Sequence, residues 1–255
     1  MRAKAFLLAA AVILLIPFAG NAATLVETFD AGISLQNWSV HRIDAAGSPW
    51  TVQAPDDRGG LRIAKAADSD AAMGASDVYG LIESRFVLHG DLSVQIDFDL
   101  LTFPLADAGG WNEAVVRLIG AETWTDFASL RFAGTAGQYA EGFSNRVWPY
   151  VTGEVVDSTS TGRLRVTRAG ETMSAWIDRG GGPERLGSLT SSTFLEPMKV
   201  QIYVVQTPQS QVRPHTALDV RFDNFLATAD AIVPEPASAV LVLLGGLALL
   251  RGRTK

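Results

Sequence analysis

The sequence predicts an all-β fold in which two antiparallel sheets pack face to face as a sandwich. Two observations support this prediction. Residues 93–100 alternate strictly between apolar and polar side chains, which is the period of a half-buried strand. Short runs of strand-forming residues also recur between Gly-, Pro- and Asp-rich turns, and no long stretch between the two termini has helical periodicity. Many short strands separated by turns are typical of a β-sandwich.

Each expected strand is short and is bounded by turn-forming residues. Sequences such as His89-Gly90-Asp91 and the Gly-rich residues 179–183 predict tight turns between neighbouring strands. Residues 66–76 are small and polar, which indicates a loop. The expected strands lie, in order, at residues 25–30, 38–41, 50–52, 61–64, 82–88, 93–100, 114–118, 128–132, 162–168, 172–178, 184–189, 199–205 and 217–229.

The N-terminus has the three parts of a secretory signal peptide. Arg2 and Lys4 supply a positive start, residues 5–18 form an apolar helix, and Gly20-Asn21-Ala22 is a small-residue cleavage site. Residues 1–22 are therefore expected to be a signal peptide, and the rest of the chain to be exported. The competing interpretation, an N-terminal membrane anchor, is disfavoured because the apolar stretch is short and the cleavage site is well placed.

The C-terminus consists of a Pro-Glu-Pro sequence, an apolar run and a basic end. Proline precedes or begins a helix, so residues 239–250 are expected to be helical from about Ala237 onward. At ~1.5 Å per residue this helix reaches about 21 Å, which is short for a ~30 Å hydrocarbon core. It would cross a membrane only with local thinning or snorkelling of its arginines. The basic residues 251–255 should stay on the cytoplasmic side.

These three parts together resemble the PEP-CTERM sorting signal of Gram-negative bacteria. The resemblance covers residues 233–255, with Pro234, Glu235 and Pro236 as the sorting motif. It implies a partner, the membrane transpeptidase exosortase, and transient anchoring in the inner membrane before release to the cell surface or the outside. In the same way, a GPI signal loses its hydrophobic tail. The alternative is a permanent tail anchor.

Composition narrows the classes of partner. The chain has 255 residues and no cysteine, so disulfides cannot stabilise it after export. Residues 23–232 suit one sandwich domain, which at this length can bury a proper core. Losing the five basic residues of the two termini takes the formal charge from −6 to −11. Such a charge argues against nucleic acid as a partner.

Two segments resemble concanavalin A-like, laminin-G-like jelly rolls. Residues 162–188, GRLRVTRAGETMSAWIDRGGGPERLGS, are similar to a strand pair of these domains, in which a basic strand, a turn and an aromatic-bearing strand precede a short loop. Residues 217–229, ALDVRFDNFLATA, are similar to their last strand. The resemblance implies a lectin-like jelly roll at residues 23–232, with the first and last strands near each other.

No catalytic motif is evident. The laminarinase-type members of this fold class carry Glu-x-Asp-x-x-Glu on a central strand, because a retaining glycosidase needs two carboxylates ~5 Å apart. The comparable strand here offers Asp97 and Asp99 without a glutamate, which indicates solvated side chains. His41, His89 and His215 lie far apart in sequence and are expected at the surface. The sequence therefore predicts a non-enzymatic domain with no catalytic residues.

Carbohydrate binding is the most specific hypothesis for the domain, because sugar rings stack on exposed aromatic residues. Trp111, Asn112 and Glu113, together with Trp124 and Asp126, lie in loop-like stretches and are the expected ligand-binding residues. Packing of these tryptophans over the end of the sandwich is the alternative. The remaining tryptophans with strand patterns are expected in the core, at Trp38, Trp50 and Trp176.

A structural calcium ion is a further hypothesis. Calcium takes six to eight oxygen ligands, mostly carboxylates and carbonyls. Glu27, Asp30, Asp219 and Asp223 would converge if the first and last strands pair. Alternatively, Asp223 is simply solvated at a strand edge.

The leading expectation is an exported, exosortase-sorted surface or extracellular-matrix protein that is non-enzymatic and binds a polysaccharide. The first alternative is a secreted glycan-active hydrolase with an unrecognised site. The second is a purely structural matrix component.

Overall fold

The computed structural model describes residues 22–44, 49–67, 77–106, 110–123, 125–134, 139–145, 160–208 and 214–235. Within these ranges the regular structure is β-strand apart from one short 3-10 helix, η1 (Ser192–Leu195), which confirms the all-β expectation. No helix among these described residues is long and apolar enough to cross a membrane. The expected helices at residues 5–18 and 239–250 lie outside the described residues.

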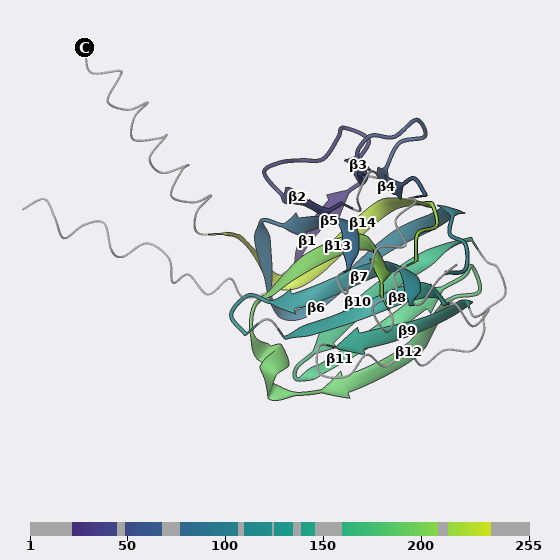
Figure 1. Cartoon of the computed structure of the whole chain (residues 1–255). Coiled ribbons are helices and arrows are strands. Elements are labelled where there is room, and N and C mark those ends of the chain that lie inside the picture. The colour runs from purple at the N-terminus through teal and green to yellow at the C-terminus, as the bar shows by residue number, and fades with distance from the viewer. Residues whose placement is uncertain are drawn as a thin grey trace, which may run out of the picture.

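The first sheet is antiparallel throughout, and β13 and β7 lie at its centre (Figure 1). Its strands are, from one edge to the other, β2 (Trp38–Ile43), β5 (Val78–Ser84), β13 (Met198–Thr207), β7 (Trp111–Gly120), β8 (Asp126–Gly134) and β9 (Tyr139–Asn145).

The second sheet is built around two long strands that pair along most of their length. These are β6 (Phe86–Thr102) and β14 (Leu218–Pro234). On the side of β14 away from β6, two short strands, β4 (Leu61–Lys65) and β1 (Ala23–Glu27), pair with successive segments of β14, and β3 (Thr51–Gln53) pairs with β4. On the other side of β6 the sheet continues through β10 (Thr161–Ala169), β11 (Thr172–Asp178) and β12 (Pro183–Thr190).

The two sheets enclose one hydrophobic core. Met198 of β13 pairs with Leu88 of β6, where the sheets meet. Alternate residues of each strand point to the interior, so that Ile96 of β6, Ile202 of β13 and Val116 of β7 are all completely buried in the same cluster. Trp38 and Trp50 are buried as well, which confirms their expected place in the core.

Pairing of the first and last strands is also as expected. Residues Ala23 to Glu27 of β1 face Ala229 to Phe225 of β14 in antiparallel register. The two-sheet antiparallel sandwich is therefore the observed architecture, and it is consistent with a jelly roll.

One expected turn is absent. The sequence His89-Gly90-Asp91 predicted a break between two strands, but β6 runs through it without interruption. The partner strand β14 accommodates Gly90 with an irregularity between Ala229 and Ala231, and Gly90 takes a positive φ of 69°. The carboxylate of Asp230 accepts a hydrogen bond from the Asp91 N–H at 3.0 Å. Long-range pairing thus overrides a local turn signal.

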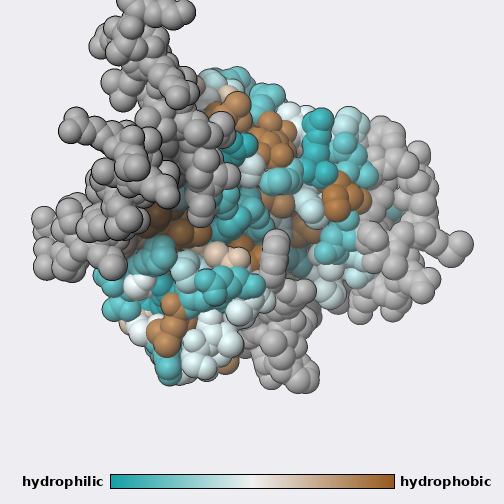
Figure 2. All heavy atoms as spheres, turned by 90° about the vertical axis from the view of Figure 1, so that its left-hand side faces the viewer, coloured by the Kyte–Doolittle hydropathy of each residue, from teal (hydrophilic) through white to brown (hydrophobic). Residues whose placement is uncertain are grey.

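The surface carries scattered apolar side chains. Figure 2 shows the side that is on the left in Figure 1, where brown hydrophobic patches lie between teal hydrophilic ones. Exposed large hydrophobic residues of the domain include Val26, Leu35 and Leu195. Single exposed apolar residues are normal in soluble domains and need no functional explanation.

Candidate functional site

The outer face of the first sheet, turned away from the core, carries an open cavity of about 660 Å³. Five neighbouring strands, from β2 to β8, contribute to it, so it extends across most of the sheet. The lining residues are His41, Asp77, Tyr79, Leu81, Glu83, Glu113, Arg117, Ile119, Asp126, Gln201, Tyr203, Val205 and Thr207.

The strand register arranges this face in rows that run across the sheet. The middle row is apolar and consists of Leu81, Tyr203, Val115 and Leu130 on successive strands. Val115 and Leu130 are buried and pack with Tyr203 into a cluster separate from the main core. The phenol ring of Tyr203 therefore packs against buried apolar side chains within the cavity wall.

A polar row lies on one side of Tyr203. Arg117 donates from Nε to Oε1 of Gln201 at 2.9 Å and from Nη1 to Oδ2 of Asp126 at 3.2 Å. Gln201 in turn donates from Nε2 to Oε2 of Glu83 at 2.5 Å. Each side chain in this row is therefore held by its neighbours on the adjoining strands.

Two carboxylates lie on the other side of Tyr203. Glu113 is on β7, and Asp77 immediately precedes β5. The side chain of Thr207 on β13 lies beside both carboxylates and lowers the pKa of each, and Trp111 acts in the same way on Glu113. Two acids from distant parts of the sequence are thus brought together around one hydroxyl.

The environment shifts the pKa of both acids upward. Burial raises the pKa of Glu113 from 4.5 to about 7, and the negative charge of Asp77 adds to the effect. Partial burial likewise raises the pKa of Asp77, although the residue as a whole is exposed, and the side chain of Thr207 opposes the rise. A strongly shifted carboxyl group in a cavity is a candidate for acid–base chemistry.

The local sequence explains why Glu113 faces the cavity. Ala114, Val116 and Leu118 alternate with polar or half-exposed residues along β7 and are completely buried between the sheets. Their burial fixes the strand's orientation, so Glu113 and Arg117 must point to the opposite face. Turning the strand over would expose the apolar residues and bury two charges.

The structure separates the five expected ligand-binding residues. Glu113 and Asp126 line the cavity, and Trp111 is half-buried at the start of β7 rather than in a loop. Asn112 lies in the interior, where its amide bonds to Pro104 O at 2.9 Å, Thr216 Oγ1 at 3.1 Å and Gln206 Nε2 at 3.1 Å.

Trp124 lies outside the described residues. The other four residues of this hypothesis, which the structure does describe, therefore divide between the cavity wall, its end and the interior. The described cavity wall contains an aromatic residue on a strand, Tyr203, and sugar binding at Trp111 and Trp124 stays a prediction.

The four expected calcium ligands do not form a cluster. Among the described residues, no group of three or more His, Asp or Glu side chains could hold a metal ion. Asp219 is paired with Arg62 through two hydrogen bonds of 2.9 and 2.7 Å. The carboxylate of Glu27 accepts the backbone N–H of Phe29 at 3.3 Å.

An arginine supplies positive charge in this region of the fold. The guanidinium of Arg221 donates to the carbonyls of Gly59 at 2.6 Å and Arg58 at 2.9 Å. It also lies 3.5 Å from a carboxylate oxygen of Asp56 and 3.4 Å from one of Asp223. Carbonyls and carboxylates of the kind that bind calcium thus surround a side-chain cation, and the calcium site at Glu27, Asp30, Asp219 and Asp223 stays a prediction.

The remaining expectations concern Asp97 and His41, of which only His41 lines this cavity. Asp97 lies in the second sheet and forms an ion pair with Arg163 at 2.5 Å, so it is not part of a carboxylate pair in the cavity. His41 lines the cavity from the exposed edge strand β2, and its Nε2 lies 3.0 Å from Ser39 Oγ. Sequence reasoning missed Asp77, Thr207 and Tyr203, which only strand pairing brings together.

No protein-family model matches the sequence, and no curated protein matches it. Comparison with solved structures does find similar folds. One belongs to the endo-acting O-glycanases that prominent members of the human gut microbiota express to initiate mucin breakdown. It has a TM-score of 0.57 and 8% identity, and the match covers 80% of this chain and 98% of that chain.

Two further matches are enzymes by description. A prokaryotic β-1,3-1,4-glucanase (lichenase) from a mouse hindgut metagenome has a TM-score of 0.54 at 14% identity, covering 82% of this chain and 99% of that chain. The alginate lyase from Klebsiella pneumoniae has a TM-score of 0.51 at 10% identity, covering 80% and 99%. At such identities the likeness establishes the fold alone.

These comparisons count against the expectation of a non-enzymatic domain. The similar structures are of glycanases, a glucanase and a lyase, which favours the alternative of a glycan-active enzyme. No catalytic motif is evident in the sequence because no single motif contains the two acids: Asp77 precedes β5 and Glu113 lies on β7.

Proposed function

We propose that the protein is a glycan-active enzyme that hydrolyses glycosidic bonds in the cavity on the outer face of the first sheet. The observation that carries the proposal is Glu113, whose pKa is raised to about 7, beside a second carboxylate, Asp77. Glycoside hydrolysis requires one proton-donating acid and one ionised carboxylate. An acid with a pKa near the working pH is suited to donate a proton.

Asp77 and Glu113 both lie beside the side chain of Thr207, and the negative charge of Asp77 raises the pKa of Glu113, so the two acids are close together. Retaining glycosidases hold their carboxyl groups about 5–5.5 Å apart, whereas inverting enzymes leave more room for a water molecule. This arrangement favours the retaining mechanism.

In that mechanism Glu113 donates its proton to the glycosidic oxygen as the bond from that oxygen to the anomeric carbon breaks. The ionised carboxylate of Asp77 forms a bond to the anomeric carbon from the opposite face. Water then attacks the same carbon, gives its proton to Glu113 and releases Asp77. The two acids finish in their starting protonation states, as a catalytic cycle requires.

The charge of the cavity favours a neutral polysaccharide. Four carboxylates line it, from Asp77, Glu83, Glu113 and Asp126, against the single guanidinium of Arg117. A uronate or sulfated chain would meet like charges at both ends of the cavity, which is unfavourable. The open cavity across five strands also suits an internal segment of a chain, and so an endo-acting enzyme.

Elimination is a second candidate reaction, because Arg117 and Gln201 flank Tyr203 and such groups can hold a uronate and move a proton. Two observations weigh against it. Arg117 is already paired with Asp126 at 3.2 Å. Burial raises the pKa of Tyr203 further above its ordinary value, which makes the phenolate a less accessible base.

Product analysis distinguishes the two reactions. The purified protein is incubated with neutral β-glucans and, separately, with polyuronates. Hydrolysis of a neutral glucan releases saturated reducing ends, and NMR of the first product reports whether the anomeric configuration is retained. Unsaturated products from a polyuronate would instead establish elimination, and no depolymerisation of either class would reject both reactions.

We further propose that the enzyme is exported and sorted through its C-terminus by an exosortase, passing through the inner membrane before release. Support comes from the Pro-Glu-Pro sequence and the apolar and basic segments that follow it. The domain's last strand, β14, extends to Pro234. The N–H of Glu235 then donates to Arg85 O at 2.9 Å, and its carboxylate forms an ion pair with Lys199.

Mass spectrometry tests this sorting proposal. Protein collected from cells that have an exosortase should give no peptides from residues 241–255. Replacing Pro234 and Pro236 with alanine should leave uncleaved protein in the membrane fraction. An intact C-terminus on the wild-type protein in such cells would reject the proposal and support a permanent anchor.

A further inference from the structure

Trp176 lies on the outer face of the second sheet, against the expectation that it belongs to the core. The neighbouring residues of β11, Ala175 and Ile177, are buried between the sheets. Because side chains alternate along a strand, Trp176 points the other way and is half-buried. A large aromatic side chain therefore sits among polar residues on the side of the sandwich opposite the cavity.

The strand neighbours of Trp176 hold its indole in place. The indole N–H donates to Thr167 Oγ1 at 3.1 Å. Its directly paired residues are Arg165 on β10 and Arg185 on β12. A β-bulge at this point adds Leu186, which packs toward the core and leaves Arg185 on the exposed face. Two arginines thus flank the aromatic ring.

The acidic residues near the indole are already engaged. Asp97 accepts a hydrogen bond from Arg163 Nε at 2.5 Å. Asp178 accepts the backbone N–H groups of Gly180 at 2.8 Å and Gly182 at 3.1 Å, which stabilises the turn between β11 and β12. These carboxylates therefore do not neutralise the two arginines beside Trp176.

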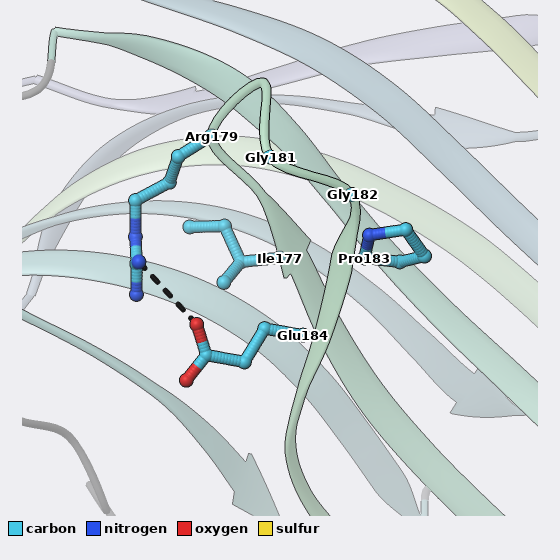
Figure 3. A pocket seen from close by; sticks show the side chains of 6 residues that line it. All are labelled: Ile177, Arg179, Gly181, Gly182, Pro183 and Glu184. Carbon is cyan, nitrogen blue, oxygen red and sulfur yellow. Dashed lines mark ion pairs between the residues drawn. The ribbon is translucent and has the colours of Figure 1, made fainter.

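Glu184 is likewise engaged elsewhere, because it forms an ion pair with Arg179 at 3.3 Å across the turn (Figure 3). By contrast, Arg165 donates to a neutral group, Ser93 Oγ, at 3.0 Å. In the part of the chain that the structure describes, neither Arg165 nor Arg185 forms an ion pair with a carboxylate.

The surface is hollowed at this place. A small cavity of about 130 Å³ is lined by Trp176, Arg165 and Gln95, among others. It adjoins a cavity of about 550 Å³ beside the β11–β12 turn, because both are lined by Ile177 and Pro183 (Figure 3). An aromatic ring, an amide, guanidinium groups and the carboxylates of Asp178 and Glu184 thus line these two adjoining cavities.

We propose that this surface, formed by Trp176, Arg165, Arg185 and Gln95, is a second, non-catalytic site that binds an acidic saccharide. The indole face offers a stacking surface for a sugar ring. The planar guanidinium groups match the geometry of a carboxylate or sulfate and can bond to it in bidentate fashion. The amide of Gln95 has both a donor and an acceptor for sugar hydroxyls.

The charge of this surface distinguishes it from the catalytic cavity. The catalytic cavity is lined by four carboxylates and one arginine, whereas the small cavity beside Trp176 is lined by two arginines, Arg163 and Arg165, and one carboxylate, Asp178. Arg185, paired with Trp176 on β12, adds a further positive charge next to it. The two faces therefore suit glycans of opposite charge: a neutral chain that is cleaved and an acidic one that is held. The inference does not depend on the proposed hydrolysis, because binding at this surface needs no residue of the cavity.

Affinity electrophoresis of the purified protein tests the proposal, with polygalacturonate as the acidic probe and dextran as the neutral control. The wild-type protein should be retarded by polygalacturonate and not by dextran. Trp176→Ala should weaken the binding at least ~10-fold, and Trp176→Phe should restore most of it. Arg165→Gln and Arg185→Gln should each weaken it several-fold. Arg85→Gln, which removes the same charge from an exposed position elsewhere, should leave it within ~2-fold.

Retardation of wild-type protein that is unchanged in Trp176→Ala would overturn the proposal, as would the absence of any retardation. A second probe, double-stranded DNA, separates saccharide recognition from general attraction to polyanions. Equal retardation by DNA, with the same response to the arginine variants and none to Trp176→Ala, would assign the surface to non-specific electrostatic binding. Melting curves of each variant establish that loss of binding is not loss of folding.

Discussion

Arg117 lies over the ring of Tyr203, with its guanidinium carbon 5.0 Å from the ring centroid. The contact joins the polar row of the cavity to its apolar middle row. It holds the phenol ring between the two carboxylates, Asp77 and Glu113, and the polar row. A fixed aromatic ring in this position is suited to pack against a sugar of the bound chain.

Tyr203→Ala should therefore weaken substrate binding more than it slows chemistry. We expect KM for a neutral glucan to rise ~10-fold or more, since a truncated aromatic anchor commonly costs ~2 kcal/mol. Tyr203→Phe keeps the ring and should stay within ~3-fold of wild type. Steady-state kinetics on both variants measures the two effects. A fall in kcat with unchanged KM in Tyr203→Ala would give Tyr203 a chemical role instead.

Glu113→Gln should stabilise the fold at alkaline pH. Burial raises the pKa of Glu113 to about 7, so the folded protein binds a proton that the unfolded chain has lost between about pH 4.5 and 7. The stabilising contribution of this group is fully present below its unfolded pKa and is lost as the pH rises through 7.

Glutamine resembles the protonated acid and does not titrate. Urea unfolding at about pH 8 should show Glu113→Gln to be more stable than wild type by at most about 3 kcal/mol. Solvent in the open cavity screens the charge of Glu113 and makes this difference smaller. At about pH 4 the two proteins should be equally stable. Glu122→Gln, at an exposed residue, is the matched control and should show no such difference. A Glu113→Gln protein that is less stable at alkaline pH would contradict the raised pKa.

Thr207→Val tests the bridge between the two acids. The side chain of Thr207 opposes the rise in the pKa of both Glu113 and Asp77, so removing its hydroxyl should raise both pKa values. The alkaline limb of the kcat/KM profile, expected at about 7 in wild type, should move to higher pH. The control is Thr172→Val, in the second sheet, which should leave the profile unchanged. An unchanged limb in Thr207→Val would remove Thr207 from the site.

The stability of the domain should be insensitive to chelators. Arg221 lies among carbonyls and carboxylates, and the described residues contain no metal cluster. Melting curves with EDTA and with excess calcium should coincide. A clear fall in Tm with EDTA alone would support the calcium hypothesis.

Arg221→Met should destabilise the fold by about 2–4 kcal/mol, because it leaves the buried carboxylate of Asp56 without its counter-charge. Urea unfolding measures the loss. Arg85→Met, at an exposed arginine, should change stability by less than about 0.5 kcal/mol. Equal stability of Arg221→Met and wild type would contradict this prediction and would mean that water, not Arg221, screens the negative charge of Asp56.

Local sequence patterns predicted much of the fold. The alternation at residues 93–100 lies within β6, and the meander at residues 162–189 lies within β10, β11 and β12. The failures at Gly90 and Trp176 have one cause. Pairing with a distant strand decides whether a turn forms and which face of a strand is buried, and a local window does not contain that information.

The candidate site was less predictable for the same reason. Glu113 was singled out only as a polar neighbour of Trp111, and its acidic partner lies before a different strand. Catalytic pairs within one motif can be recognised from spacing, whereas Asp77, Glu113 and Thr207 meet only through the register of β5, β13 and β7. A raised pKa is likewise a property of burial and not of the residue type.

The most direct test of the central claim is the rate of reducing-end release from a neutral β-glucan by wild type, Glu113→Gln and Asp77→Asn. General acid catalysis contributes ~10²–10⁴-fold, so each substitution should lower kcat by about 10³ while the melting curve stays that of a folded protein. Asp126→Asn, which alters a carboxylate in the polar row of the same cavity, should retain most of kcat. Full activity in Glu113→Gln would contradict the account.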